Sequence, residues 1–153
     1  MPKVKEWVEK RCVGKVLNLF AGKTLLEVNE VRVDIDRENA IADYYMDAFE
    51  FVSTWKGKKF DTVILDPPYR IRKSMEKYHG CVVSSYQKIR RNLVKILTRN
   101  ATVISLGYNS SSIGLGFEKK EICLVHHGGA HNDTIILLEK RVGSIEDYFD
   151  KFK

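Results

Sequence analysis

The tetrapeptide Asp66-Pro67-Pro68-Tyr69 is the part of the sequence best suited to chemistry. It directly follows the apolar run Val63-Ile64-Leu65, which predicts a buried strand. Ligands of open α/β sheets bind at the carboxyl ends of such strands. Two prolines fix the backbone and remove its donors, so the simpler interpretation is a rigid turn that ends the strand. A plain turn requires neither an acid before the prolines nor an aromatic ring after them. We therefore predict a ligand site here.

The tetrapeptide lies within an alternation of apolar runs and helical stretches, which predicts an α/β fold. Runs that are apolar on both faces are typical of a parallel sheet covered by helices. We expect parallel strands over residues 15–19, 31–35, 60–65 and 101–106, a weaker strand over 42–46, and helices over 4–11, 86–97 and 145–152. Strands 121–127 and 134–140 have too short a connection for a parallel crossover and must form a hairpin. The prediction is a three-layer sandwich whose mostly parallel sheet ends in an antiparallel pair.

Length and composition favour a small protein that acts without a second domain. The 153 residues suffice for one domain, 1–153, with no separate recognition domain. No apolar run approaches the roughly 18 residues that span a bilayer, and the charged first dozen residues contain no signal-peptide core. Cys12, Cys81 and Cys123 stand far apart and form no CxxC pair. We expect a soluble cytoplasmic protein with reduced thiols.

Positive charge is concentrated in one part of the chain. Residues 70–99 contain nine basic side chains and a single acid, Glu76, whereas the chain as a whole has a net charge of +6. The segment therefore carries +8 and the remainder −2. A solvated helix face usually mixes both signs, and this segment does not. Such a surface attracts polyanions and gains from counterion release, which predicts contact with nucleic acid.

Together with the tetrapeptide, three further segments resemble one known family, the S-adenosylmethionine-dependent amino-methyltransferases that methylate exocyclic amines of nucleobases and carry a DPPY-type motif. Residues 16–22, with the sequence VLNLFAG, resemble the first cofactor motif, D-x-F-x-G-x-G. Residues 33–36 are similar to the second strand, whose acid holds the cofactor ribose, and residues 47–49 resemble the acid that meets the cofactor adenine. The resemblance covers roughly residues 15–140, including the closing hairpin. It implies a Rossmann-like class I methyltransferase fold and S-adenosylmethionine as cofactor.

The resemblance also implies the site residues. Catalytic roles fall on Asp66, Pro67, Pro68 and Tyr69, and cofactor binding falls on Asn18, Phe20, Ala21, Gly22, Asp34, Ile35, Asp47 and Ala48. Gly22 permits a tight turn, and Asp34 can accept two hydrogen bonds from ribose hydroxyls. Taken alone, an acid at a strand end is at least as often a solvated charge or a helix cap, and Asp43 competes with Asp47 for the adenine.

The first cofactor motif departs from the family pattern at two places. Asn18 replaces the usual acid, and Lys23-Thr24 follow Gly22 where a second glycine is expected. An amide can position a loop, but it cannot pair with the cofactor ammonium as a carboxylate does. Only residues 23–30 separate this turn from the next strand, so the helix expected after the first strand must be very short.

The implied reaction starts from a poor nucleophile, because the lone pair of an exocyclic amine is delocalised into its ring. Asp66 and the carbonyl of Pro67 can each accept one N–H and redirect that lone pair. Tyr69 would stack on the extruded base. Basic residues that follow directly are expected to contact phosphates: Arg70, Arg72, Lys73 and Lys77.

The expected substrate is adenine N6 in DNA, and DNA is favoured over RNA as partner. An RNA methyltransferase acting on adenine or guanine amines is the second interpretation. A nucleic-acid-binding module that kept the fold but lost turnover is the third, motivated by Asn18 and the missing second glycine. The absence of a recognition domain is compatible with a homo-oligomer or with a partner that supplies specificity.

The hairpin connection is rich in potential metal ligands: His126, His127, His131 and Asp133. Their spacing matches no zinc signature and no metal is expected. This connection and residues 107–112 should lie on the same edge of the sheet as Asp66. Contact with nucleic acid at the rim of the site and a plain surface loop are both open for them.

Overall fold

The computed structural model describes residues 2–68, 77–78, 81–82, 86–114, 116–129 and 133–143. The N-terminal part contains α1 (Pro2–Glu9), β1 (Val16–Leu19), β2 (Glu30–Asp34), β3 (Tyr44–Tyr45), α2 (Ala48–Thr54) and β4 (Phe60–Leu65). It is followed by β5 (Lys77–Tyr78), β6 (Cys81–Val82), α3 (Tyr86–Leu93), the 3-10 helix η1 (Val94–Ile96), β7 (Leu97–Gly107), β8 (Phe117–Val125) and β9 (Thr134–Arg141).

Seven strands form one sheet in the order β3-β2-β1-β4-β7-β9-β8. Five neighbouring strands are parallel, namely β3, β2, β1, β4 and β7. In contrast, β9 pairs antiparallel with both β7 and β8. This arrangement confirms the predicted fold class, a mostly parallel sheet that ends in an antiparallel hairpin. A separate antiparallel ladder between β5 and β6 was not predicted.

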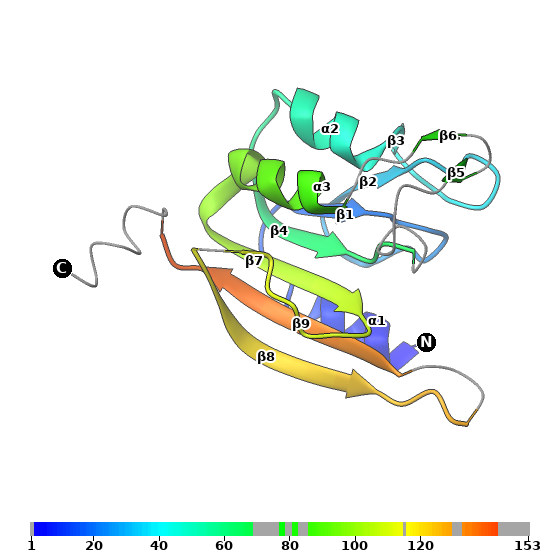
Figure 1. Ribbon diagram of the computed structural model, residues 1–153, viewed down its shortest axis with the longest axis vertical. Helices are drawn as coiled ribbons and strands as arrows, with labels where there is room; N and C mark the ends of the chain where they lie inside the picture. Colours follow the sequence, from blue (N-terminus) through cyan, green and yellow to red (C-terminus); the bar gives the residue numbers. More distant parts are fainter. Residues whose placement is uncertain are drawn as a thin grey trace.

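Helices cover both faces of the sheet, with α2 and α3 on one side and α1 on the other (Figure 1). Alternate residues of β1 divide between these layers: Leu17 and Leu19 join the core beneath α2 and α3, and Val16 joins the core beneath α1. In the α1 layer, Val8 packs in one cluster with Ile64 of β4. Each fully buried aliphatic side chain of this kind contributes about 1.5–3 kcal/mol.

The connections that follow β1 and β2 contain no helix, although residues 20–43 are all described. The expected short helix after the first strand is therefore wrong. Phe20 and Gly22 both have positive φ angles, 63° and 58°, which turn the chain sharply instead of starting a helix. The few residues that remain before β2 form turns and bends.

Several element boundaries differ from the sequence predictions. The helix expected over 86–97 ends at Leu93 and passes through η1, because Leu97 already pairs with Phe60 as the first residue of β7. The penultimate strand begins at residue 117 rather than 121 and is exposed along most of its length, as expected of an edge strand. The helix expected over 145–152 lies outside the described residues. Within the part of the chain that is described, no helix is long and apolar enough to cross a membrane.

Candidate functional site

A pocket of about 330 Å³ opens at the carboxyl edge of the parallel strands. Its wall is built from the ends of neighbouring strands and from the residues that follow them, including Phe20, Gly22, Asp34, Asp47, Asp66, Pro67, Pro68, Leu106, Gly107 and Thr134. The pocket spans the point between β1 and β4 where the strand order reverses direction. Ligands of open α/β sheets bind at this switch point.

Most of the cofactor and catalytic residues predicted from the sequence meet in this pocket: Phe20, Gly22, Asp34, Ile35, Asp47, Ala48, Asp66, Pro67 and Pro68. Asn18 and Ala21 instead line an adjoining pocket of about 350 Å³ toward α1, which shares Phe20, Gly22 and Asp66 with the first. Tyr69, Arg70, Arg72 and Lys73 lie outside the described residues, and Lys77 begins the short strand β5. The roles of all these residues stay predictions.

The carboxylate of Asp34 at the end of β2 holds two main-chain amides. Its Oδ2 accepts a hydrogen bond from Gly22 N and its Oδ1 accepts one from Asp36 N, both at 2.9 Å. The first bond fixes the turn after β1 against the end of β2. A carboxylate has about four acceptor positions, so Asp34 retains capacity for two hydroxyl groups of a ligand.

Asp47 lines the pocket and also caps a helix. Its Oδ1 accepts hydrogen bonds from Phe49 N at 3.0 Å and from Glu50 N at 3.2 Å, which satisfies two free amides at the start of α2. The competing acid, Asp43, accepts a hydrogen bond from Arg32 N at 2.8 Å and does not line the pocket. Of the two candidate acids, the fold therefore brings Asp47 to the site.

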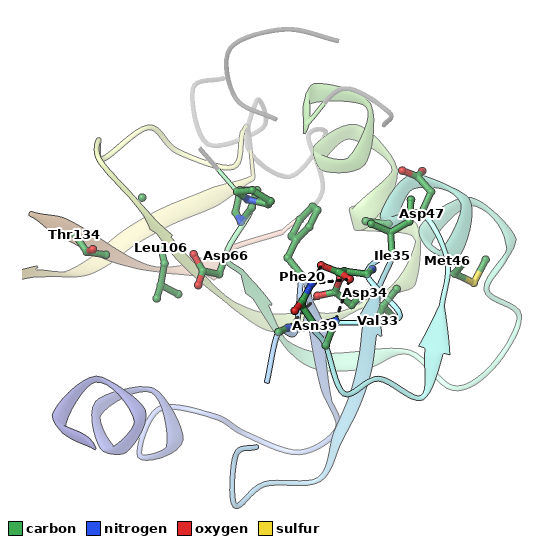
Figure 2. Close-up of a pocket in the computed structure, with 17 residues that line it drawn as sticks. Phe20, Val33, Asp34, Ile35, Asn39, Met46, Asp47, Asp66, Leu106 and Thr134 are labelled. Carbon is green, nitrogen blue, oxygen red and sulfur yellow. Dashed lines mark hydrogen bonds between the residues drawn. The ribbon is translucent and has the colours of Figure 1, made fainter. Parts of the chain in front are cut away.

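Asp66 and the two prolines are presented by the buried strand β4, which lies between β1 and β7. The strand ends at Leu65, after which Asp66 is exposed and Pro67 is buried. In Figure 2, the ring of Phe20 lies between Asp66 on one side and Asp34 and Asp47 on the other. Three acids, one at the end of β2, one after β3 and one after β4, thus line one pocket around an aromatic side chain.

Position 22 favours glycine because of its backbone conformation, not because a side chain would collide with its neighbours. Its φ of 58° is in the left-handed region, and a Cβ added there would meet nothing within 4 Å. Phe20 adopts the same region with φ 63°, which costs an L-residue about 1–2 kcal/mol. Such strain is typical of functional sites whose surroundings hold the backbone in place.

A buried polar network next to the site was missed by the sequence reasoning. The Asn18 amide donates to Oε2 of Glu30 at 2.9 Å, and Arg32 donates to Oε1 of the same carboxylate at 2.6 Å. The side chains of Arg32 and Glu30 are only 6% and 7% exposed. In the sequence, a charged residue flanked by Val31 and Val33 indicates a solvent-facing position in a strand, so the only local signal pointed the other way.

The described ends of the hairpin connection lie at the carboxyl edge of the sheet together with Asp66, as predicted, whereas His131 lies outside the described residues. His127 lines the adjoining pocket, Thr134 lines both pockets, and His127 Nε2 lies 2.9 Å from Thr134 Oγ1. Asp133 lies 2.7 Å from His126 Nδ1, and this contact lowers the pKa of the Asp133 carboxyl. Over the described ranges, no three His, Cys, Asp or Glu side chains gather closely enough to hold a metal ion.

The electrostatics of the pocket select the kind of ligand that it can hold. Asp34, Asp36, Asp47 and Asp66 all line it. Acids accept hydrogen bonds from hydroxyls and amines and favour a cationic centre, but they repel phosphate. No helix follows β1 to offer its N-terminus to a pyrophosphate. The pocket therefore suits a cationic nucleoside better than a dinucleotide.

Neither family models nor curated protein sequences match the chain. Solved structures do match. The N-methyltransferase NodS from Bradyrhizobium japonicum WM9 superposes with a TM-score of 0.64 at 12% identity, covering 92% of this chain and 96% of NodS. NodS in complex with S-adenosyl-L-homocysteine gives a TM-score of 0.59 at 8% identity, over 92% of this chain and 86% of that one. TrmN from Thermus thermophilus gives 0.63 at 15% identity over 91% of this chain, which spans only 47% of TrmN. At these identities the likeness concerns the fold, and the chain has the Rossmann-like fold of these methyltransferases.

Proposed function

We propose that this protein transfers the methyl group of S-adenosylmethionine to an exocyclic amino group of a nucleobase, with adenine N6 in DNA as the first choice. The observation that carries this proposal is the convergence of Asp66 and Pro67 with Asp34 and Asp47 on one pocket. This convergence supports the proposal, because the residues expected to accept the amine protons line the same pocket as the acids expected to bind a nucleoside. The fold shared with methyltransferases supports the same reaction class.

The residues of the pocket fit the cofactor. Asp34 would accept the ribose hydroxyls, Asp47 would meet the adenine, and the turn at Gly22 leaves open space beside the chain. When bound, S-adenosylmethionine supplies an electrophilic methyl group on a positively charged sulfur. The acids of the pocket stabilise that positive charge.

The amine would be activated by two fixed acceptors. The Asp66 carboxylate and the Pro67 carbonyl each accept one N–H, which favours a pyramidal nitrogen with its lone pair directed away from the ring. Pro67 is buried and Pro68 follows it, so the backbone here is stiff and offers no N–H of its own. A binding module has no evident need for such a pair of acceptors.

The proposal is tested by incubating the purified protein with labelled S-adenosylmethionine and separate pools of DNA and RNA, followed by identification of the methylated nucleoside. We expect N6-methyl-2′-deoxyadenosine in the DNA pool. Label only in RNA would establish the second interpretation. Cofactor binding without label in either pool would favour the non-catalytic module.

Nucleic acid contact by Arg70, Arg72 and Lys73 is proposed from charge and from their position directly after the tetrapeptide. Each lost phosphate contact should reduce the magnitude of the salt slope, d log K/d log[salt], by about 0.7 to 0.9. Replacing the three residues together by Ala and titrating nucleic acid at several salt concentrations measures this change. Wild-type affinity and slope in a folded variant would show that nucleic acid docks elsewhere.

A further inference from the structure

Arg32 is a buried arginine in the middle of β2, only 5% exposed. A guanidinium has five N–H donors, and here every one has an acceptor. One is Oε1 of Glu30, at 2.6 Å. The other four are carbonyl oxygens of Ala21 at 2.9 Å, Gly22 at 3.1 Å, Thr24 at 2.8 Å and Ile41 at 2.7 Å. Arg32 therefore ties the connection after β1 to the connection after β2.

The peptide group between Ala21 and Gly22 is held from both ends by β2. Its carbonyl accepts a hydrogen bond from Arg32 Nη2, and its N–H donates to Asp34 Oδ2, each at 2.9 Å. The carbonyl and N–H of a trans peptide point in opposite directions, so these two bonds together fix the plane of the peptide. They also fix it relative to Asp34, the acid proposed to hold the cofactor ribose.

These two hydrogen bonds matter because the connection after β1 contains no helix or strand that would hold it in place. A helix directly after β1 would bond these carbonyls internally, but no helix follows β1 here. Phe20, one residue earlier, sits in a left-handed conformation that a phenylalanine does not favour on its own. The turn at the pocket wall therefore depends on hydrogen bonds from β2 and from Ile41 N, and the Arg32 side chain supplies two of them.

We propose that Arg32 is a positioning residue of the pocket. From the α1 side of the sheet, it holds the turn Phe20–Gly22, and through that turn Asp34, in the geometry that binds the cofactor. The inference rests on the proposed function, since the pocket is taken as the S-adenosylmethionine site. Lysine at this position keeps the charge but has three donors instead of five, so at least two of the five acceptors lose their hydrogen bond to this side chain.

The test compares Arg32→Lys with Arg141→Lys. Arg141 in β9 is a matched control, because its guanidinium also donates to main-chain carbonyls, those of Val94, Leu97 and Thr98, but it lies outside both pockets. Calorimetry with S-adenosylhomocysteine should show an affinity at least about tenfold weaker for Arg32→Lys and wild-type affinity for Arg141→Lys. Urea unfolding of both variants separates positioning from a general loss of stability.

A second readout does not require a ligand. The Gly22 amide, bonded to Asp34, should exchange with deuterium at least about tenfold faster in Arg32→Lys, while amides of β4 exchange as in the wild type. Wild-type affinity and wild-type exchange at Gly22 in Arg32→Lys would overturn the inference. The inference would also be overturned if Arg32→Lys and Arg141→Lys both lost affinity in proportion to their loss of stability.

Two further outcomes are informative. If Arg32→Lys does not fold, the double variant Arg32→Met with Glu30→Gln removes all five donors without leaving a buried charge unpaired, and the same loss of affinity is expected. Wild-type affinity in that folded double variant would contradict the role of Arg32. If the wild-type protein does not bind S-adenosylhomocysteine, the proposed function fails, and the exchange rate of Gly22 still decides whether Arg32 holds the turn.

Discussion

The side-chain amide of Asn18 donates a hydrogen bond to the buried carboxylate of Glu30, with 2.9 Å between Nδ2 and Oε2. This contact gives a physical reason for the departure of the first cofactor motif from the family pattern. Asn18 is only 6% exposed, so an aspartate in its place would put two carboxylates in contact away from water. With Glu30 as neighbour, an amide is the better residue.

Asn18→Asp should therefore destabilise the protein at pH 7 by about 1–3 kcal/mol, measured as the free energy of unfolding in urea. The matched variant is Glu30→Gln, which itself removes a charge partner of Arg32. In a double-mutant cycle, Glu30→Gln should cost less in the Asn18→Asp background than in the wild type. Strictly additive costs would show that the two side chains do not interact.

Asp34→Ala should weaken the binding of S-adenosylhomocysteine at least tenfold, because the charge-assisted hydrogen bonds to a ribose diol contribute about 1.5–3 kcal/mol. Asp43→Ala is the control: Asp43 also accepts a main-chain N–H but lies outside the pocket. Calorimetry on both variants measures the difference. Unchanged affinity in folded Asp34→Ala would remove Asp34 from the site.

The two roles of Asp47 can be separated by two substitutions. Asp47→Ala loses both the cap of α2 and the carboxylate, and should lower the free energy of unfolding by about 0.5–2 kcal/mol. Asp47→Ser keeps a capping oxygen and should retain most of the stability. Both should bind S-adenosylhomocysteine more weakly. Full affinity in Asp47→Ser would mean that Asp47 serves the site only as a helix cap.

Asp66→Ala should lose nearly all methyl transfer while its affinity for S-adenosylhomocysteine stays within about threefold of the wild type. The reason is that hydrogen bonds to the amine strengthen as its nitrogen becomes pyramidal, so they act on the transition state more than on binding. Single-turnover rates and calorimetry measure the two effects separately. A variant with more than a tenth of the wild-type rate contradicts the role of Asp66.

Cys12 should resist alkylation in the folded protein. Burial above all, together with the nearby carboxylates of Glu30 and Glu9, raises the pKa of its thiol to about 11. At pH 8 only about a thousandth of the thiol is ionised, and the thiolate is the reactive form. Mass spectrometry should show that labelling of Cys12 by iodoacetamide accelerates as the pH approaches 11, and that it is fast at pH 8 in urea. Rapid labelling at pH 8 in the folded state would disprove this.

The sequence by itself determined the layers of the sheet and the position of Asp66 and the two prolines at its edge. Both follow from local patterns. The apolar run that ends at Leu65 is buried because both faces of a parallel strand are covered, and the short connection over 128–133 permits only an antiparallel hairpin. Asp66 lies at the carboxyl end of β4 because it directly follows the apolar run in the sequence, and this placement does not depend on its neighbours in space.

Only the tertiary structure decided how the pocket wall is held. A charged residue between two valines predicts a solvent-facing position, yet Arg32 is buried, because its guanidinium donates to the carbonyls of Ala21, Gly22, Thr24 and Ile41. The choice of Asp47 over Asp43 likewise depended on which acid the end of β3 directs to the pocket. These outcomes rest on contacts between segments far apart in the chain, and local periodicity carries no information about the partners that such segments meet.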